Sequence, residues 1–309
     1  MQQFTKPMSK YNFWKNKKVF ITGGDGFVGR SLSLELSKRM AKVFLFDGEI
    51  RDYQKLYKQF KNSKATIIYH LAAQSLIEVG KISPIETFEI NIIGTWNILE
   101  VARNIGIEKI VVASTTHVYG DNPNLPYKEE YYPQPSRPYE TSKASADLIS
   151  QCYADTYNLP VEISRMVNLY GPGDMNLSRI FPKIITKLIK GENPIMFDVG
   201  AVRDFLYIDD AVEGYIKLVE TDLPNIKRAR VINFGSGKPI NILELVNKII
   251  HQFGNTELKL ILQNAPEERD KEIKKQYVSI TKARNLLNWK PIISLEKGIE
   301  KTIEFYRNL

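Results

Sequence analysis

The chain has 309 residues, and 43% of them are hydrophobic, which is enough to bury a sizeable core in one large domain or two unequal lobes. Its formal net charge is +8, but the Lys residues are spread along the chain and alternate with acidic residues, so we expect no nucleic-acid partner. No apolar run approaches the ~18 residues of a membrane span and the N-terminal residues lack the apolar stretch of a signal peptide, so we expect a cytoplasmic protein outside the membrane.

Short β-branched and aromatic runs alternate with helical patterns in the first half of the chain. Residues 18–22 (KVFIT) predict a strand that ends at two glycines, and apolar spacing predicts a helix over 28–40. Further strands are predicted at 43–46, 66–71 and 109–113, with helical stretches such as 91–105 between them. Strands that alternate with helices form parallel βαβ units, so we expect an α/β fold of the Rossmann type with a doubly wound parallel sheet.

From about Gly171 onward the pattern changes, which predicts a second and smaller lobe. Apolar spacing predicts a helix over 180–189, a strand at 194–197, a helix at 242–253 and a last helix near the C-terminus. We therefore expect a Rossmann domain over residues 1–170 with a return segment at about 203–235. A mixed α/β substrate lobe would be built from residues 171–202 and 236–309.

Three glycines, Gly23, Gly26 and Gly29, follow the first predicted strand in the spacing G-x-x-G-x-x-G and open the first helix. Such glycines permit a tight turn and let the backbone approach a pyrophosphate, whose charge is favoured at a helix N-terminus. We therefore predict that a dinucleotide is bound by these glycines and by their neighbours Asp25, Phe27 and Val28.

Asp47 closes the second predicted strand. An acidic side chain at this place can accept a hydrogen bond from the adenosine ribose and would repel a 2′-phosphate, which favours NAD over NADP. The alternative is that Asp47 only initiates the turn before Gly48.

Tyr139 and Lys143 are four residues apart, which places a phenol and an ammonium on one face of a helix. The cation lowers the pKa of the phenol, and the phenolate can take the proton of an alcohol whose carbon gives a hydride to a nicotinamide. The spacing alone also fits two residues on a solvated helix. Together with the glycine loop and a Ser/Thr-rich segment near residue 115, it favours a redox enzyme.

With these residues the chain resembles the extended short-chain dehydrogenase/reductase superfamily, in particular the nucleotide-sugar epimerases and dehydratases. The resemblance covers nearly the whole chain. It includes the segments HLAAQ at 70–74, NIIGTWN at 91–97, VYG at 118–120, RMVNLYGPG at 165–173 and RDF at 203–205. The opening FWKNKKVF and the segment GEIRD at 48–52 are most similar to the CDP-glucose and GDP-mannose dehydratases. Relatives have a longer segment between the acid after the second strand and GEIRD, whereas Asp47 and Gly48 are adjacent here.

The resemblance implies a division of roles among the side chains. Leu71, Ala72 and Ala73 would line the cofactor, and Glu49 and Ile50 would flank its adenine. The substrate would be a nucleoside-diphosphate sugar, for which a positive field and arginine forks are suited. Its binding residues would be Gln74, Asn168, Arg179, Arg203 and Arg269. For the last two arginines the alternative is a surface ion pair with a neighbouring acid.

Thr115 matches the place where the family has a Ser or Thr that hydrogen-bonds the C4 oxygen and completes a triad with Tyr139 and Lys143. A core-facing threonine is the alternative. The dehydratases commonly carry Asp-Glu, Asp-Lys or Ser-Glu at the next two positions, where this chain has Thr116 and His117. Threonine cannot act as a carboxylic acid does. Histidine, with an unperturbed pKa of ~6.5, can serve as a base or as a structural hydrogen-bonding residue.

We therefore expect an enzyme that oxidises the C4 hydroxyl of a nucleoside-diphosphate hexose with NAD, as a C4 epimerase or a C4 dehydrogenase/reductase. The alternative is a 4,6-dehydratase with His117 as base, and a more distant one is a non-catalytic NAD-binding interaction protein. A homodimer and a place in polysaccharide biosynthesis are implied by the resemblance alone. The single cysteine, Cys152, and three scattered histidines lead us to expect no metal site.

Overall fold

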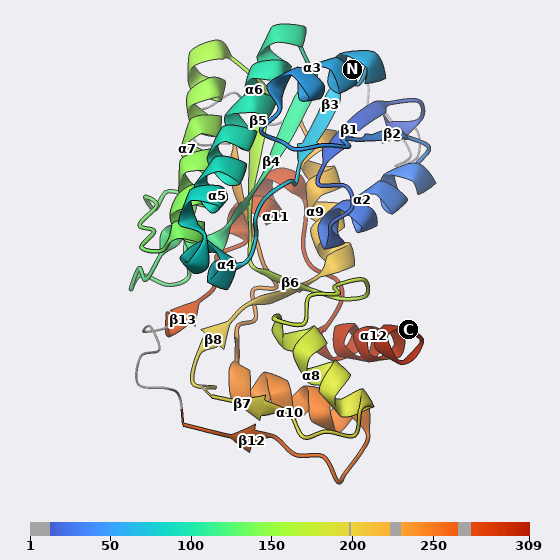
Figure 1. Cartoon of the computed structure of the whole chain (residues 1–309), viewed down its shortest axis with the longest axis vertical. Helices are drawn as coiled ribbons and strands as arrows, with labels where there is room; N and C mark the ends of the chain where they lie inside the picture. Colours follow the sequence, from blue (N-terminus) through green and yellow to red (C-terminus); the bar gives the residue numbers. More distant parts are fainter. Residues whose placement is uncertain (1–12, 198, 223–229, 265–272) are drawn as a thin grey trace, which may run out of the picture. The chain divides into compact units, whose positions relative to one another are not determined.

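The computed structural model describes residues 13–197, 199–222, 230–264 and 273–309 (Figure 1). Its largest element is a six-stranded sheet with the strand order β10-β5-β4-β3-β1-β2. Strand β1 pairs in parallel with β2 and with β3, and β3 pairs in parallel with β4. The strands are β1 (Lys18–Thr22), β2 (Lys42–Leu45), β3 (Ile67–His70), β4 (Lys109–Thr115), β5 (Val161–Met166) and β10 (Val231–Phe234). The predicted Rossmann-type sheet is confirmed.

Burial differs between the two outermost strands of this sheet, β10 and β2. Every residue of β3, β5 and β10 is buried, whereas Lys42 and Leu45 of β2 are exposed. Parallel strands that are covered by helices on both faces read as continuous apolar runs, as Val19–Ile21 and Ile110–Val112 do. The exposed ends of β2 fit its place at the sheet edge.

Helices cover the sheet on both faces (Figure 1). Helix α2 (Phe27–Lys38) packs on β1 and β2, while α3 (Tyr53–Ser63), α6 (Gly94–Ile105) and α7 (Pro138–Tyr157) pack against one another in that order. The connections from β1 to β2 and from β2 back to β3 run in opposite directions, so right-handed crossovers place α2 and α3 on opposite faces.

The predicted helix over 91–105 starts differently in the structure. Residues 89–93 form a π-helical turn, and the α-helix begins at Gly94. The wider turn accompanies the hydrogen bonds of Asn91, whose side chain bonds to residues outside its own helix. Such a turn depends on contacts with distant residues, so the apolar spacing did not reveal it. Two short helices precede it, α4 (Ile77–Ile82) and α5 (Pro84–Phe88).

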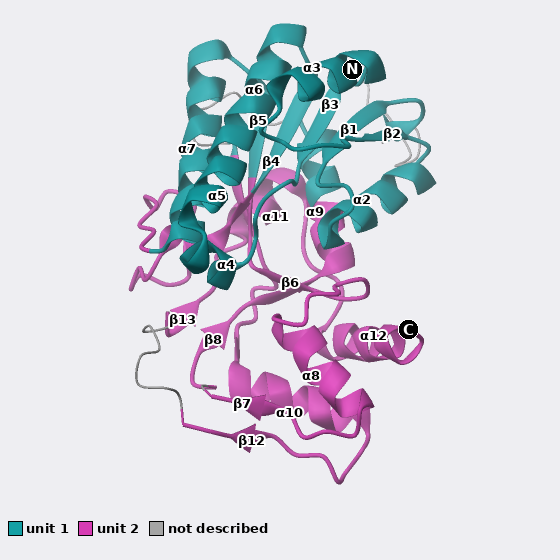
Figure 2. Cartoon of the chain, viewed as in Figure 1, with its two compact units in different colours: residues 1–113, 137–163, 215–230 teal, residues 114–136, 164–214, 231–309 magenta. Residues whose placement is uncertain are grey.

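The chain forms two compact units (Figure 2). The first comprises Met1–Ala113, Arg137–Ile163 and Tyr215–Arg230, and the second comprises Ser114–Ser136, Ser164–Gly214 and Val231–Leu309. These boundaries differ from the predicted 1–170 and 203–235. Residues 114–136 join the second unit, where Tyr127 exchanges backbone hydrogen bonds with Tyr277 and Ser279 at 2.9 and 2.8 Å.

The second unit is a mixed α/β arrangement of short strands and helices. Strand β8 (Val202–Arg203) lies between β11 (Ile240–Asn241) and β13 (Lys275–Gln276), β6 (Asn168–Tyr170) pairs with β9 (Phe205–Tyr207), and β7 (Ile195–Met196) pairs with β12 (Ile261–Leu262). The helices α8 (Ile180–Ile189), α10 (Ile242–Phe253) and α12 (Leu295–Arg307) pack together. The predicted helices at 180–189 and 242–253 therefore agree with the structure. Helix α11 (Thr281–Leu287) also belongs to this unit, whereas α9 (Ile208–Glu220) is divided between the two units after Gly214.

In the part of the chain that the structure describes, we find no helix with the length and apolar character required to span a membrane.

Candidate active site

The glycine loop joins β1 to α2 and is shaped by two close backbone approaches. A Cβ atom on Gly23, whose φ is +72°, would lie 2.6 Å from the backbone nitrogen of Ala72. A Cβ atom on Gly29 would lie 2.2 Å from the carbonyl oxygen of Gly23. Neither position has room for a side chain. Both glycines are therefore required for the loop itself.

Gly26 differs from these two glycines because space is open above it. It is the N-cap of α2 with an ordinary φ of −74°, and a Cβ atom there would meet only the Gly23 carbonyl oxygen, at 3.3 Å. Asp25 is exposed, and Phe27 and Val28 are half-buried in the first turn of α2. An open helix N-terminus with small residues is suited to an anionic group such as a pyrophosphate.

Leu71, Ala72 and Ala73 continue from the end of β3 beside this loop. The N–H of Leu71 donates to the Thr22 carbonyl at 3.1 Å, and the N–H of Ala72 donates to the Thr22 hydroxyl at 3.3 Å. All three residues are half-buried. The structure thus brings the predicted cofactor-lining segment and the glycine loop together at one edge of the sheet.

The three residues predicted near the adenosine end of the cofactor differ in whether their side chains already have partners. Asp47 is exposed two residues beyond β2, its backbone is held by Gln59, and its carboxylate has no partner within the described ranges. Glu49 is paired with Arg51 at 2.9 Å, and this hydrogen bond lowers the pKa of Glu49. Ile50 is buried and packs against Gly94. Of the two acids, only Asp47 keeps its carboxylate available for a ligand.

His70 stands at the end of β3 in a fully buried hydrogen-bond network. Its Nδ1 lies 2.8 Å from the Thr22 hydroxyl, and its Nε2 lies 3.1 Å from the Thr95 hydroxyl. Thr95 donates to the Asn91 carbonyl at 2.6 Å, so it accepts from His70, and Nδ1 accepts from Thr22. These bonds assign a neutral imidazole that is protonated on Nε2. Burial, together with the charge of Lys143, lowers the pKa of His70 to about 3.

The same network reaches the helix that carries Tyr139. The Asn91 amide donates to the Gln74 carbonyl at 2.9 Å and to the Ser142 hydroxyl at 2.8 Å, and Ser142 donates to the Tyr139 carbonyl at 2.7 Å. Buried hydrogen bonds of this kind fix the groups that they join. The start of α7 is therefore tied to the end of β3.

Tyr139 and Lys143 lie in the first turns of α7, where helical spacing places them on one face. Lys143 is 7% exposed, and its Nζ donates to the Ala113 carbonyl at 2.5 Å. Burial lowers the pKa of Lys143 to about 8, and nearby Asp147 acts in the opposite direction. A cation held on this face favours the ionised form of the neighbouring phenol.

Gly80 was missed by the sequence reasoning, yet it touches Tyr139. A Cβ atom on Gly80 would lie 3.2 Å from the backbone nitrogen of Tyr139 and 3.3 Å from its Cβ. The absence of a side chain lets α4 approach the start of α7. No local pattern marks this glycine, because its φ is ordinary and its neighbour is 59 residues away in the sequence.

Thr115, Thr116 and His117 belong to the second unit, whereas Tyr139 and Lys143 belong to the first. Strand β4 ends at Thr115, and residues Thr116–Tyr119 form the 3-10 turn η2. The Thr115 hydroxyl accepts from the His117 N–H at 3.3 Å and caps this turn. Thr115 and Thr116 are buried, and His117 is half-buried. Their catalytic roles stay predictions.

Gln74 is engaged within its own loop. Its Nε2 donates to the Leu76 carbonyl at 3.0 Å and to the Thr87 hydroxyl at 2.9 Å, and its Oε1 accepts from the Leu76 N–H at 2.5 Å. Both ends of the amide therefore hold the loop. The predicted contact of Gln74 with the substrate stays a prediction and would require this amide to exchange partners.

The predicted substrate residues of the second unit lie in two places. Arg203 is 8% exposed on β8, and Asn168 donates to the carbonyl of the adjacent Asp204 at 3.4 Å, so these two positions are neighbours. Arg179 precedes α8 and forms an ion pair with Asp174 at 3.3 Å. Arg269 lies outside the described residues.

Gln276 is a further polar residue at this place, and the sequence reasoning missed it. It pairs with Arg203 in the register of β13 and β8 and is 1% exposed. Neither its side-chain nitrogen nor its oxygen has a hydrogen-bond partner in the described part of the chain. Buried polar groups are almost always paired, so this amide is a candidate for contact with a ligand or an ordered water that offers both a donor and an acceptor. A single Gln in a Lys-rich segment carries no recognisable signal.

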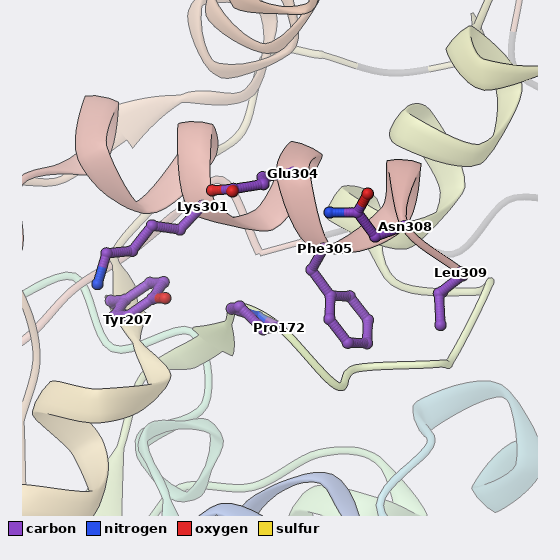
Figure 3. A pocket seen from close by; sticks show the side chains of 7 residues that line it. All are labelled: Pro172, Tyr207, Lys301, Glu304, Phe305, Asn308 and Leu309. Carbon is purple, nitrogen blue, oxygen red and sulfur yellow. The ribbon is translucent and has the colours of Figure 1, made fainter.

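The second unit also has a pocket of about 430 Å³ (Figure 3). The Nζ of Lys301 lies 5.7 Å from the centroid of the Tyr207 ring, and none of the predicted site residues that the structure describes lines the pocket. Its lining residues are Pro172, Tyr207, Lys301, Glu304, Phe305, Asn308 and Leu309. Within the described ranges, no group of three or more His, Cys, Asp or Glu side chains is arranged to hold a metal ion.

We expect His70 to make the folded protein less stable as the pH falls. The unfolded chain takes up a proton at this histidine near its ordinary pKa of 6.5, whereas the folded chain resists until about pH 3. Between these values the unfolded state binds more protons, so the free energy of unfolding falls by about 2 kcal/mol from this group at pH 5. Urea unfolding at pH 7 and pH 5 measures this loss.

The matched variants are His70→Gln, which should remove this part of the pH dependence, and His251→Gln at an exposed position, which should keep it. An unchanged pH dependence in His70→Gln would contradict the neutral buried imidazole.

We expect Gln276→Leu to raise the free energy of unfolding of the ligand-free protein by about 1–2 kcal/mol, because a buried unsatisfied polar atom costs about 1–3 kcal/mol. Gln74→Leu is the control and should lower it, since that amide is fully bonded. Thermal and urea unfolding measure both variants. A lower stability of Gln276→Leu would show that an ordered water already satisfies the amide.

Comparisons with known proteins show which family this chain is similar to. A family model described as GDP-mannose 4,6 dehydratase matches residues 31–302. The UDP-glucuronate 4-epimerase of Thermodesulfobacterium geofontis is 31% identical over 276 residues, which cover 87% of this chain and 80% of that protein. A dTDP-D-glucose 4,6-dehydratase of Bos taurus is 26% identical over 320 residues, which cover 94% of this chain and 89% of that protein.

A solved structure shows the same likeness. The UDP-glucose 4-epimerase of Thermus thermophilus in complex with NAD matches with a TM-score of 0.84 at 26% identity and covers 94% of this chain and 98% of that chain. The family model spans most of the chain, and the family predicted from the motifs is confirmed. The chain thus belongs to the GDP-mannose 4,6 dehydratase family, among the nucleotide-sugar epimerases and dehydratases of the extended short-chain dehydrogenase/reductase superfamily.

Proposed function

We propose that this protein oxidises the C4 hydroxyl of a nucleoside-diphosphate sugar with NAD and acts as a C4 epimerase or a C4 dehydrogenase/reductase. The observation that carries the proposal is the buried ammonium of Lys143, held on the same helical face as Tyr139. A phenol next to a fixed cation is suited to take a proton from an alcohol at neutral pH.

In this proposal the first unit holds the cofactor. The open N-terminus of α2 at Gly26 would receive the pyrophosphate, and the free carboxylate of Asp47 would bond the adenosine ribose. Bound NAD would supply the acceptor for the hydride that leaves C4. Tyr139 would take the proton of the C4 hydroxyl while Lys143 stabilises the phenolate. Thr115 would hydrogen-bond the C4 oxygen.

The second unit would bind the nucleoside diphosphate. Arg203 offers a guanidinium for phosphate oxygens, and the neighbouring Asn168 and Gln276 offer amides for polar groups of the sugar nucleotide. Arg179 and Arg269 would be further phosphate partners. The lack of a hydrogen-bond partner for the Gln276 amide supports a polar ligand beside Arg203.

The residues after Thr115 favour epimerisation or simple oxidation over dehydration. Removal of the C5 proton and loss of the C6 hydroxyl need a base and an acid, and Thr116 cannot replace a carboxylic acid. The second candidate is a 4,6-dehydratase in which His117 is the base. It is favoured by the dehydratase relatives and by the name of the family model.

We also propose that the protein forms a homodimer through α6 and α7. Large apolar side chains are exposed on both helices: Trp96 on α6 is 43% exposed, and Leu148 and Tyr157 on α7 are each 51% exposed. Sedimentation equilibrium measures the mass, and a monomer would contradict the proposal. We also propose a cytoplasmic location from the sequence and a place in polysaccharide biosynthesis from the family resemblance.

We expect Tyr139→Phe to lower kcat by roughly 10²–10⁴-fold, because the proton of the C4 hydroxyl loses its acceptor. NAD binding should be retained. Tyr153→Phe is the matched control on the same helix, since that hydroxyl bonds to Glu100 at 3.1 Å on α6. Steady-state turnover of a panel of nucleotide sugars measures both variants. Near-normal turnover of Tyr139→Phe would refute the assigned base.

We expect the reaction in deuterated water to leave the product mass unchanged for an epimerase, or lower by two hydrogens for a dehydrogenase. Mass spectrometry and NMR of the product distinguish these outcomes. Loss of water together with solvent deuterium at C5 would instead establish the dehydratase. In that case His117→Asn should abolish dehydration while oxidation at C4 continues.

A further inference from the structure

Arg165 is a buried arginine on β5 that the proposed reaction does not use. It is 2% exposed, its Nη1 donates to the Tyr119 hydroxyl at 2.9 Å, and its guanidinium carbon lies 4.9 Å from the centroid of the Tyr119 ring. One cation therefore contacts both the hydroxyl and the ring of a single tyrosine. These two contacts leave the Tyr119 ring little freedom to rotate or to shift.

Tyr119 is itself held from its other side. Its hydroxyl donates to the Asn233 Oδ1 at 2.8 Å. The backbone N–H of Asn233 donates to the Glu129 carboxylate at 2.9 Å, and its side-chain amide donates to the Tyr127 carbonyl at 3.1 Å. Burial raises the pKa of Tyr119 to about 12, so the phenol keeps its proton. The directions of the bonds are thereby settled: Tyr119 accepts from Arg165 and donates to Asn233.

The turn that ends at Tyr119 also carries Thr116 and His117. The Gly120 N–H donates to the His117 carbonyl at 3.1 Å, and the Gln134 N–H donates to the Val118 carbonyl at 2.9 Å. Gly120 has a φ of +60°, and a Cβ atom there would lie 1.9 Å from the Gln134 carbonyl oxygen. At the other end the Thr115 hydroxyl accepts from the His117 N–H, so hydrogen bonds hold the turn at both ends. These bonds link the position of Tyr119 to that of His117.

We propose that Arg165 is a positioning residue, which acts through Tyr119 to hold the turn at 116–119, and with it the Thr115 hydroxyl that caps this turn, in the conformation that turnover requires. An apolar side chain would fill the same space without the desolvation of a buried charge, so what Arg165 adds is a directed hydrogen bond. The effect on turnover rests on the proposed function. The effect on the turn does not, because it follows from contacts within the second unit.

The conformational test uses the histidine signals in NMR spectra of the full-length protein. The chain has three histidines, so the imidazole signals can be assigned with His117→Asn and His251→Asn. We expect Arg165→Met and Tyr119→Phe to shift or broaden the His117 signals and to leave those of His70 and His251 in place. Arg230→Met is the matched control: Arg230 is also buried but donates to the Leu159 carbonyl at 3.2 Å, so the His117 signals should not move.

The kinetic test compares the same variants. We expect Arg165→Met and Tyr119→Phe to lower kcat by about 10- to 100-fold with NAD affinity unchanged, since small misplacements of catalytic groups cost up to about 10²-fold. The double variant Arg165→Met/Tyr119→Phe should have a kcat no lower than the lower of the two single-variant values, because both changes remove the same hydrogen bond between Arg165 and Tyr119. A purely structural arginine would instead lower the melting temperature without moving the His117 signals or kcat.

The outcomes separate this proposal from the proposed function. Unchanged His117 signals in folded Arg165→Met and Tyr119→Phe would overturn it, and so would a kcat within twofold of the wild type. If Arg165→Met does not fold, Tyr119→Phe decides alone, since it removes a single oxygen atom. If the wild-type protein turns over no nucleotide sugar, the proposed function fails, while the NMR comparison still decides whether Arg165 holds the turn.

Discussion

The rest of the first unit depends on the buried ammonium group of Lys143. Lys143 is 7% exposed, and the Ala113 carbonyl accepts a hydrogen bond from its Nζ. A cation removed from water needs polar partners and must not face a second cation. His70 meets the second condition because its hydrogen bonds and its lowered pKa keep it neutral. Asp147 adds a compensating charge.

The strands and helices around this lysine bring the other groups of the proposed cofactor site together. Parallel strands place their carboxyl ends at one edge of the sheet, so the glycine loop after β1 and the segment after β3 meet there. Asn91 and Ser142 then tie the start of α7 to that edge. The phenol, the ammonium and the open helix N-terminus at Gly26 thus rest on one connected framework of buried hydrogen bonds within the first unit.

In the second unit, some buried polar side chains are fully hydrogen-bonded, and Gln276 has no hydrogen-bond partner among the described residues. Asp204 is fully engaged, since its carboxylate accepts from the N–H groups of Ser236 and Gly237. Tyr119 is likewise bonded on both sides. Gln276 has neither bond and stands beside Arg203.

The sequence by itself determined the features that are encoded locally. The strand at 18–22, the helices at 180–189 and 242–253, the glycine spacing and the Tyr139–Lys143 pair all follow from periodicity or from short spacings, which neighbouring residues alone decide. The motifs were enough to place the chain in its family. Only the tertiary structure decided the unit boundaries, the π-helical turn before Gly94, the internal bonds of Gln74, and the roles suggested for Gly80, Arg165 and Gln276. These depend on residues far apart in the chain, such as Tyr119 and Asn233, which are 114 residues apart. No local pattern records such partners, because burial and hydrogen bonding are settled only when the chain is packed.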